Sequence, residues 1–425
     1  MIVLLRLGGV SLLALVFSAL FVPTTYHEIK IGFLLAALTS IGILGLSSKL
    51  IWSSETLMAC FMLAIFGLLN SVHGLLNSAP GAVRVLSVMV VWPILYAVLS
   101  TMLNRPDAIK ILVSTLAVTF VAIQSYSFLY LGYMAGVVPD VLYFELDQGQ
   151  GVGFYDGTVE YSLYSISSLL FLMPFWLHYL FNLVHEKRAK ISHWVLLLTG
   201  LVICVLTGRR AVQLVVLISP FLVLLSVVMV GGGIQKGYRV VGSLFNVYSM
   251  ALVSISVVIL LFVFFSMGIH FDAIAENFKH GFEFTSDISA SERGNQFVSL
   301  MNAWLDGNLL FGAGNGSHTD YLRSDDMPWA YELTYVYLLF STGIVGVLFY
   351  FGWFGWGLLR IRNALLYRPD MGFYITPIIT GVFGLAVGAA SNPYFAKFDY
   401  LWIVLLPHLL AGAIKYQGNS VVKYV

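Results

Sequence analysis

Several arginines and one glutamate between residues 209 and 332 are candidates for a catalytic or anion-binding site. Arg209 and Arg210 stand side by side in a short segment between two apolar runs, and Glu332 enters a later apolar run just behind Pro328. Guanidinium groups pair bidentately with phosphate oxygens, and a carboxylate can accept a proton from a hydroxyl group. This combination suggests group transfer on a phosphorylated substrate at a membrane surface.

The Arg209–Arg210 pair is expected at the start of a helix that begins after Gly208. The free N–H groups and the macrodipole at such a place favour an anion, so two cations there are mildly unfavourable unless an anion binds. The alternative is that both side chains extend to lipid headgroups or pair with loop acids. We prefer the anion site of these two interpretations.

Arg293 precedes a run of apolar residues at the spacing of an amphipathic helix. The run consists of Phe297, Leu300, Met301, Trp304 and Leu305. Because Arg293 lies four residues before Phe297, it is expected on the apolar stripe, pointing toward the protein. Alternatively, its stem packs on the stripe while its charged head stays in water.

Weaker candidates follow this helix. The glycine-rich stretch 310–316 predicts a compact turn rather than a phosphate-binding loop, because no Lys-Ser or Lys-Thr follows it. His318 could carry a proton near neutral pH, although a lone loop histidine is more often simply solvated. Arg323 adds another basic residue. Asp325 and Asp326 lack a second set of ligands, so no metal site and no cofactor are expected.

Glu332 has two interpretations that the sequence leaves open. Pro328 suits the first turn of a helix, and an acid soon after it would complement the helix dipole. The other interpretation is a general base at the mouth of an apolar span. Tyr335, three residues further on, is a possible additional site residue.

The elements that must hold these residues are membrane helices. The chain has 425 residues, 59% hydrophobic and 10% charged, whereas soluble domains average about a quarter charged. We predict an all-α polytopic membrane protein with about twelve transmembrane helices, because each span needs roughly 20 apolar residues. Their centres are expected near residues 14, 39, 63, 92, 120, 172, 201, 220, 257, 345, 381 and 406. The first run is interpreted as a retained helix rather than a signal peptide.

The charge distribution predicts the orientation. With the N-terminus inside, cytoplasmic segments hold fourteen of the 22 Lys and Arg residues, and the opposite face outside the large loop holds five. Both termini are therefore expected in the cytoplasm. Residues 1–268 would carry helices one to nine, 269–329 a periplasmic loop with the amphipathic helix, and 330–425 helices ten to twelve. A second external segment, 132–160, is acidic and glycine-rich, and is expected to be an irregular solvated loop rather than a lid over a substrate.

The order of these motifs resembles the O-antigen ligase and O-antigen polymerase superfamily. The resemblance covers 207–346 in motif and the whole chain in topology. It consists of a Thr-Gly-Arg-Arg-Ala segment opening a span, a Glu-Arg-Gly step, an amphipathic helix with a tryptophan, a Phe-Gly-Ala-Gly turn, and a Tyr-Glu-Leu-Thr-Tyr segment running to Gly-Ile-Val-Gly. The ligases have a histidine about eleven residues before the Gly-Ile-Val-Gly segment, where this chain has Glu332. This departure favours a polymerase. His318 is the residue that could take the place of the ligase histidine.

The resemblance implies a metal-independent, inverting membrane glycosyltransferase in the bacterial inner membrane. Its donor would be a polyprenyl-diphosphate-linked oligosaccharide on the periplasmic face. Arg209 or Arg210, and Arg293, match family positions that bind the donor diphosphate; we add Arg323 to them, and assign Glu332 as the base with Arg293 as the second catalytic residue. The expected partners are this lipid-linked glycan, membrane lipids and a chain-length regulator protein, with no nucleic acid.

Two rivals remain. A ligase would move finished polymer onto lipid A core with the same chemistry. A flippase or transporter would also have about twelve spans, but such proteins usually carry ionisable residues or broken helices at the membrane midplane. Here the span centres are almost free of charge, which favours an enzyme.

Overall fold

The structure is a computed structural model and describes residues 2–46, 50–105, 107–146, 150–155, 158–231 and 288–422. Within these ranges, nine helical stretches are long and apolar enough to cross a membrane. Two shorter apolar helices, Arg6–Phe21 and Ile191–Leu206, account for two further expected spans. Eleven of the twelve predicted centres therefore fall in an apolar helix, and the predicted span near residue 257 lies outside the described residues.

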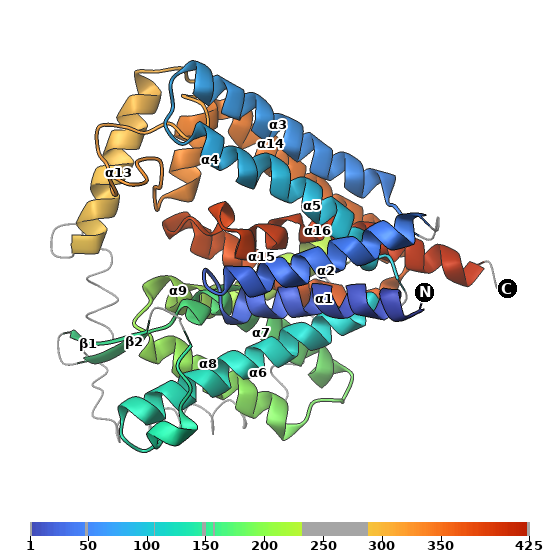
Figure 1. The fold of residues 1–425 in the computed structure, drawn as a ribbon. Coiled ribbons are helices and arrows are strands. Elements are labelled where there is room, and N and C mark those ends of the chain that lie inside the picture. Colours follow the sequence, from blue (N-terminus) through green and yellow to red (C-terminus); the bar gives the residue numbers. More distant parts are fainter. Residues whose placement is uncertain are drawn as a thin grey trace.

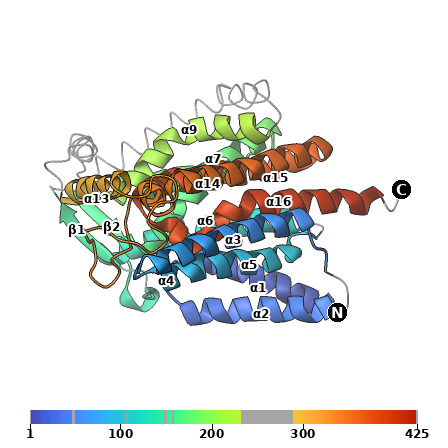
Figure 2. The same cartoon turned by 90° about the horizontal axis from the view of Figure 1, so that it is seen from above.

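The spanning helices share one approximate axis in both views (Figures 1 and 2). In chain order they are α1 (Ile2–Phe21), α2 (His27–Leu46), α3 (Ser54–Leu76), α4 with α5 (Ala82–Leu86, Trp92–Leu99), α6 (Ala108–Met134), α7 (Leu169–His185), α8 (Ile191–Leu206), α9 (Arg210–Val230), α14 (Thr334–Tyr367), α15 (Gly372–Gly388) and α16 (Phe398–Val422). A π-helical turn, Ser87–Val91, joins α4 to α5, and short 3-10 turns cover Ser100–Met102, Asp140–Leu142, Tyr164–Ser168, Pro369–Met371, Ala389–Ser391 and Tyr394–Ala396.

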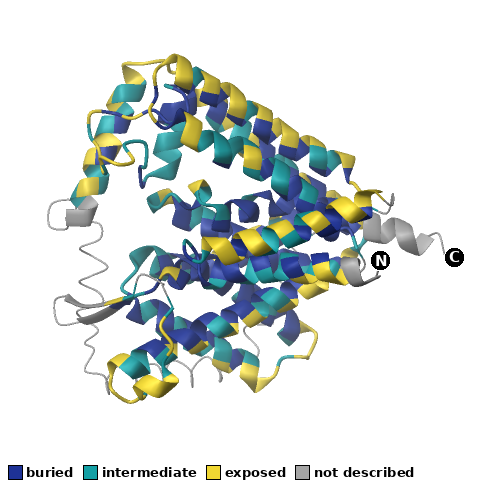
Figure 3. Cartoon of the chain, viewed as in Figure 1, coloured by how far each residue is buried: buried dark blue, intermediate teal, exposed yellow. Residues whose placement is uncertain are grey.

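The core of the bundle is formed by α7, α15 and α16. About four fifths of the spans containing α7 and α16 are buried (83% each), against 28% for α2, so α2 lies at the periphery. Figure 3 shows the same pattern, with buried residues along the central helices and exposed ones along the outer faces of α2 and α3. Exposed apolar side chains there, such as Ile31 and Leu35 on α2, suit contact with lipid tails rather than water.

The acidic segment 132–160 is not irregular throughout, which corrects the sequence-based expectation. Gly151–Tyr155 (β1) and Thr158–Ser162 (β2) pair as a two-stranded antiparallel sheet, with Phe154 opposite Val159. Within the described ranges the fold is thus helical with one small hairpin. The alternating glycines that suggested a loop lie in β1, where the period-2 pattern of a strand also fits them.

One end of the bundle carries the polar elements. The amphipathic helix α13 (Ile288–Leu305) lies across the bundle axis there, near the hairpin and opposite the start of α1 (Figure 1). This confirms a helix where the apolar spacing predicted one. The turn before α9 and the loop between α15 and α16 meet at the same end, as the contacts below show.

Helix α14 is interrupted at Gly343, whose φ of 64° and ψ of −169° are not helical. The glycine-rich turn after α13 fills the interruption. Ala313 and Gly314 donate their N–H groups to the carbonyls of Phe340 and Ser341 (2.9 and 2.8 Å). In return, Ile344 and Val345 donate to the carbonyls of Leu309 and Leu310, both at 3.0 Å. Backbone groups freed at membrane depth must find partners within the protein, and this turn provides them.

The turn can approach α3 closely because it has glycine at position 314. Gly314 has φ of 89°, and a Cβ there would lie 2.3 Å from the backbone nitrogen of Gly74 in α3. The prediction of a compact turn after α13 is confirmed. Its N–H groups are used within the protein, so this stretch does not form a phosphate cradle.

Candidate functional site

Glu332 lies between two arginines that are distant in sequence. Its Oε2 accepts from Arg293 Nε at 2.8 Å, across 39 positions of the chain, and its Oε1 pairs with Arg323 Nη2 at 2.7 Å. The Glu332 side chain is 11% exposed, against 31% for Arg293 and 46% for Arg323. A solute approaching from outside therefore meets guanidinium groups before it meets the carboxylate.

Helix α13 places Arg293, but with a different inward face from the one predicted. Leu300 and Gln296 are fully buried, whereas Phe297 is 48% and Leu305 57% exposed. The inward stripe therefore runs from Arg293 through Gln296 and Leu300, and Phe297 and Leu305 were wrongly assigned to it. Arg293 does point toward the protein, as expected.

Gln296 is a member of the site that the sequence did not reveal. Its Oε1 accepts from the backbone N–H of Glu332 at 3.0 Å, which fixes the glutamate immediately before α14. Its Nε2 is buried and has no hydrogen-bond partner among the described residues. An unsatisfied buried donor costs about 1–3 kcal/mol, and this one belongs to the side chain that holds the Glu332 backbone.

The second arginine group is in the turn between α8 and α9. Gly208 has φ of 61°, which lets α8 end at Leu206 and α9 start at Arg210, as predicted. Arg209 donates to Ser167 Oγ at 2.8 Å and to Ser162 Oγ at 3.1 Å. Ser162 ends β2, so the hairpin helps to hold this guanidinium; Arg210 is half-buried.

The loop between α15 and α16 connects the two arginine groups. Tyr394 donates its hydroxyl to Ser167 Oγ at 3.4 Å, the atom that also accepts from Arg209. Thr334, the first residue of α14, donates its hydroxyl to the carbonyl of Asn392 at 3.0 Å. The loop thus touches both the Arg209 turn and the helix that follows Glu332.

The pKa shifts of two residues in the loop between α15 and α16 show that charges from both arginine groups act on this loop. Burial raises the pKa of Tyr394; Arg209 and Arg293 oppose that rise and Glu332 adds to it. Burial lowers the pKa of Lys397, and the positive charges of Arg209 and Arg323 lower it further, against Asp399. Arg209, Arg293, Arg323 and Glu332 therefore act on one loop, although they come from three separate parts of the chain.

The other predicted candidates lie apart from this cluster. His318 is exposed, as are Asp325 and Asp326, and nothing among the described contacts joins them to Glu332. Tyr335 donates its hydroxyl to the carbonyl of Ala386 at 2.6 Å, which turns it toward α15. The described residues contain no group of three or more His, Cys, Asp or Glu side chains placed to hold a metal.

An apolar cavity of about 180 Å³ begins beside the cluster. Thr334 and Tyr335 line it two and three residues after Glu332, and Phe395 lines it directly after Tyr394. Deeper lining residues, including Leu338, Trp353 and Val404, come from α14 and α16. A charged cluster and an apolar cavity therefore adjoin each other.

The fold defines a helical membrane protein of many spans, with a cationic site at one end of its bundle. A scan against protein-family models finds no model that matches the chain, and a search of curated proteins finds no match either.

Proposed function

We propose that this protein is a membrane glycosyltransferase that polymerises polyprenyl-diphosphate-linked oligosaccharide repeat units, as the resemblance to O-antigen polymerases implies. The observation that supports it most is the excess of cations around Glu332, directly beside an apolar cavity. A lipid diphosphate has the matching halves: an anionic head for the arginines and an apolar chain for the cavity.

The proposed reaction exchanges one bond at the sugar. The acceptor hydroxyl oxygen attacks the anomeric carbon of the donor, the bond from that carbon to the diphosphate oxygen breaks with inversion, and the diphosphate leaves as an anion. Arg293 and Arg323, with Arg209 and Arg210, stabilise the charge that develops on it; removing one such donor typically costs about 10²–10³-fold in rate. The leaving group needs no proton, so a second carboxylic acid is not required.

Glu332 accepts the proton of the acceptor hydroxyl. Both carboxylate oxygens are bound to guanidinium groups in the present state. Diphosphate oxygens can compete for the same guanidinium groups, and that exchange would free the carboxylate only when the donor is in place. Base catalysis of this kind typically contributes about 10²–10⁴-fold.

The test is Glu332→Gln in purified protein supplied with lipid-linked repeat units. We expect chain extension to fall by about 10²-fold or more, with the protein still folded in the membrane. Asp325→Asn is the matched control, because Asp325 is an exposed acid of the same loop outside the cluster. Unchanged polymer length and amount in Glu332→Gln would show that Glu332 is not the base.

A cell assay separates polymerase from ligase, which share this chemistry. Loss of a polymerase leaves single repeats on the lipid A core, and loss of a ligase leaves none. The interruption of α14 does not favour a transporter, because the backbone groups beside Gly343 bind the glycine-rich turn and are not free for an ion.

A further inference from the structure

The loop between α15 and α16 contains a lysine that the mechanism above does not use. Lys397 is half-buried at the entrance to α16, and it lies in electrostatic range of Arg209 and Arg323. No described residue forms a hydrogen bond or ion pair with its ammonium group. A half-buried cation beside two others is unfavourable unless an anion compensates it.

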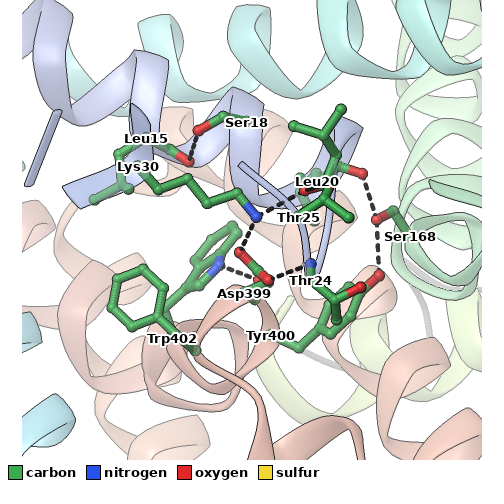
Figure 4. Close-up of polar contacts among 12 residues, drawn as sticks. Leu15, Ser18, Leu20, Thr24, Thr25, Lys30, Ser168, Asp399, Tyr400 and Trp402 are labelled. Carbon is green, nitrogen blue, oxygen red and sulfur yellow. Dashed lines mark hydrogen bonds and ion pairs between the residues drawn. The ribbon is translucent and has the colours of Figure 1, made fainter. Parts of the chain in front are cut away.

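The nearest acid in the chain, Asp399, is already occupied. Its Oδ1 accepts from Lys30 Nζ at 2.8 Å, and its Oδ2 accepts from the backbone N–H of Thr24 at 2.7 Å (Figure 4). Lys30 also donates to the carbonyl of Val22 at 2.7 Å. Lys30 and Asp399 are each 3% exposed, so this pair is a closed unit within the bundle.

Further hydrogen bonds around the Lys30–Asp399 pair hold the start of α16 in place. Ser168 donates to the carbonyl of Leu20 at 2.6 Å and lies 3.2 Å from the Tyr400 hydroxyl (Figure 4). On the other side, Tyr96 donates its hydroxyl to the carbonyl of Phe398 at 2.7 Å. The start of α16 is therefore held to three other parts of the bundle. The Lys397 ammonium group forms no hydrogen bond or ion pair with a described residue, and Asp399 acts on it only through longer-range electrostatics.

We infer that Lys397 is a further binding residue for the anionic head of the lipid substrate, and that the contacts of Asp399 with Lys30 and Thr24 keep its carboxylate oxygens from pairing directly with Lys397. This inference rests on the proposed function. Of Arg209, Arg293, Arg323 and Lys397, the described residues give an ion pair to Arg293 and Arg323 alone, both with Glu332. These four cations thus outnumber the two carboxylates, Glu332 and Asp399, that act on them, and Asp399 is already paired with Lys30. A diphosphate would offset the remaining positive charge.

The test measures binding of farnesyl diphosphate to the full protein in nanodiscs, with the alcohol farnesol as the uncharged comparison. Lys397→Gln should weaken diphosphate binding by about tenfold, a loss of about 1.4 kcal/mol, and leave farnesol binding unchanged. Lys397→Arg is the matched control and should bind like the original protein. An unchanged diphosphate affinity in Lys397→Gln, or an equal loss for both ligands, would overturn the inference.

A second test compares the pH dependence of diphosphate binding in the original protein and in Lys397→Arg, which keeps the positive charge. Burial, Arg209 and Arg323 lower the Lys397 pKa, with Asp399 acting against them, so Lys397 loses its proton below the pH at which an ordinary lysine does. Diphosphate affinity should therefore fall as pH rises through that value, and stay flat in Lys397→Arg. Identical pH profiles would count against Lys397. If the original protein bound diphosphate no better than farnesol, the proposed function itself would fail.

Discussion

Two clusters at opposite ends of α14 each place one glutamate between two cations. At one end Glu332 pairs with Arg293 and Arg323; at the other, Glu55 of α3 pairs with Arg360 of α14 at 3.2 Å and Lys415 of α16 at 2.7 Å. Thr334 and Arg360 are separated by roughly 40 Å along α14 at 1.5 Å per residue. The same local pairing therefore occurs at both ends of a membrane-spanning helix.

The surroundings of the two clusters differ. Arg360 is 8% exposed; it lies 3.0 Å from His408 Nδ1 and over the ring of Trp356, so its guanidinium is fully used by neighbouring helices. All three charged residues of the Glu55 cluster belong to regular helices. The Glu332 cluster is built from a helix across the bundle axis, a loop and a chain segment before a helix, with further cations nearby. An ion pair alone thus does not indicate function; the Glu332 cluster differs from the Glu55 cluster in its further cations and in the apolar cavity beside it.

The sharpest contrast is expected between Arg293→Met and Arg360→Met. Arg293→Met should lower kcat/KM by about 10²–10³-fold, because it removes a donor to the leaving group, with a small change in Tm. Arg360→Met should destabilise the protein by about 1–3 kcal/mol, since it leaves buried polar partners unpaired, and should leave the rate per folded molecule nearly unchanged. Polymer assays and thermal unfolding in detergent measure both. Equal kinetic losses in the two variants would remove the distinction between the clusters.

A smaller effect is expected from Gly343→Ala, which tests whether the interruption of α14 holds Glu332 in place. A Cβ at Gly343 would lie 2.3 Å from the Leu310 carbonyl oxygen, and its backbone conformation is one that other residues rarely adopt. We expect a loss of about 1–3 kcal/mol in stability and reduced activity in the folded fraction. Gly352→Ala in the same helix is the control, because nothing lies within 4 Å of its added Cβ. Equal Tm values for both variants would show that the interruption is not strained.

The spans could be predicted because a membrane helix has a local sequence signal, a run of about 20 predominantly apolar residues. The start of α9 after Gly208 and the helix at α13 were local patterns of the same kind. The pairing of Glu332 with Arg293 could not be predicted from a local pattern. Arg293 lies 39 positions away, and only the packing of α13 against α14 brings the two residues together. The apolar spacing also predicted Phe297 on the buried face, whereas the structure buries Gln296, which accepts a hydrogen bond from the Glu332 backbone. A contact of this kind with a distant segment leaves no trace in the apolar spacing.

The interruption of α14 was equally hidden. Gly343 stands in an apolar run, and glycine is common in membrane helices. The sequence therefore gives no sign of an interruption at this residue. Its role depends on the turn that contains Gly312 and Gly314, which hydrogen bonds to both sides of it. The role proposed for Lys397 depends on its surroundings in the fold, including the Lys30–Asp399 pair, whose members lie 369 positions apart.

The most direct measurement is a cryo-EM structure of the protein in nanodiscs with a bound polyprenyl diphosphate. We predict phosphate density between the turn at Arg209 and the guanidinium of Arg293, with the polyprenyl chain entering the cavity beside Tyr335 and Phe395. Density for the diphosphate at the Glu55 cluster, or anywhere else remote from both arginines, would contradict it.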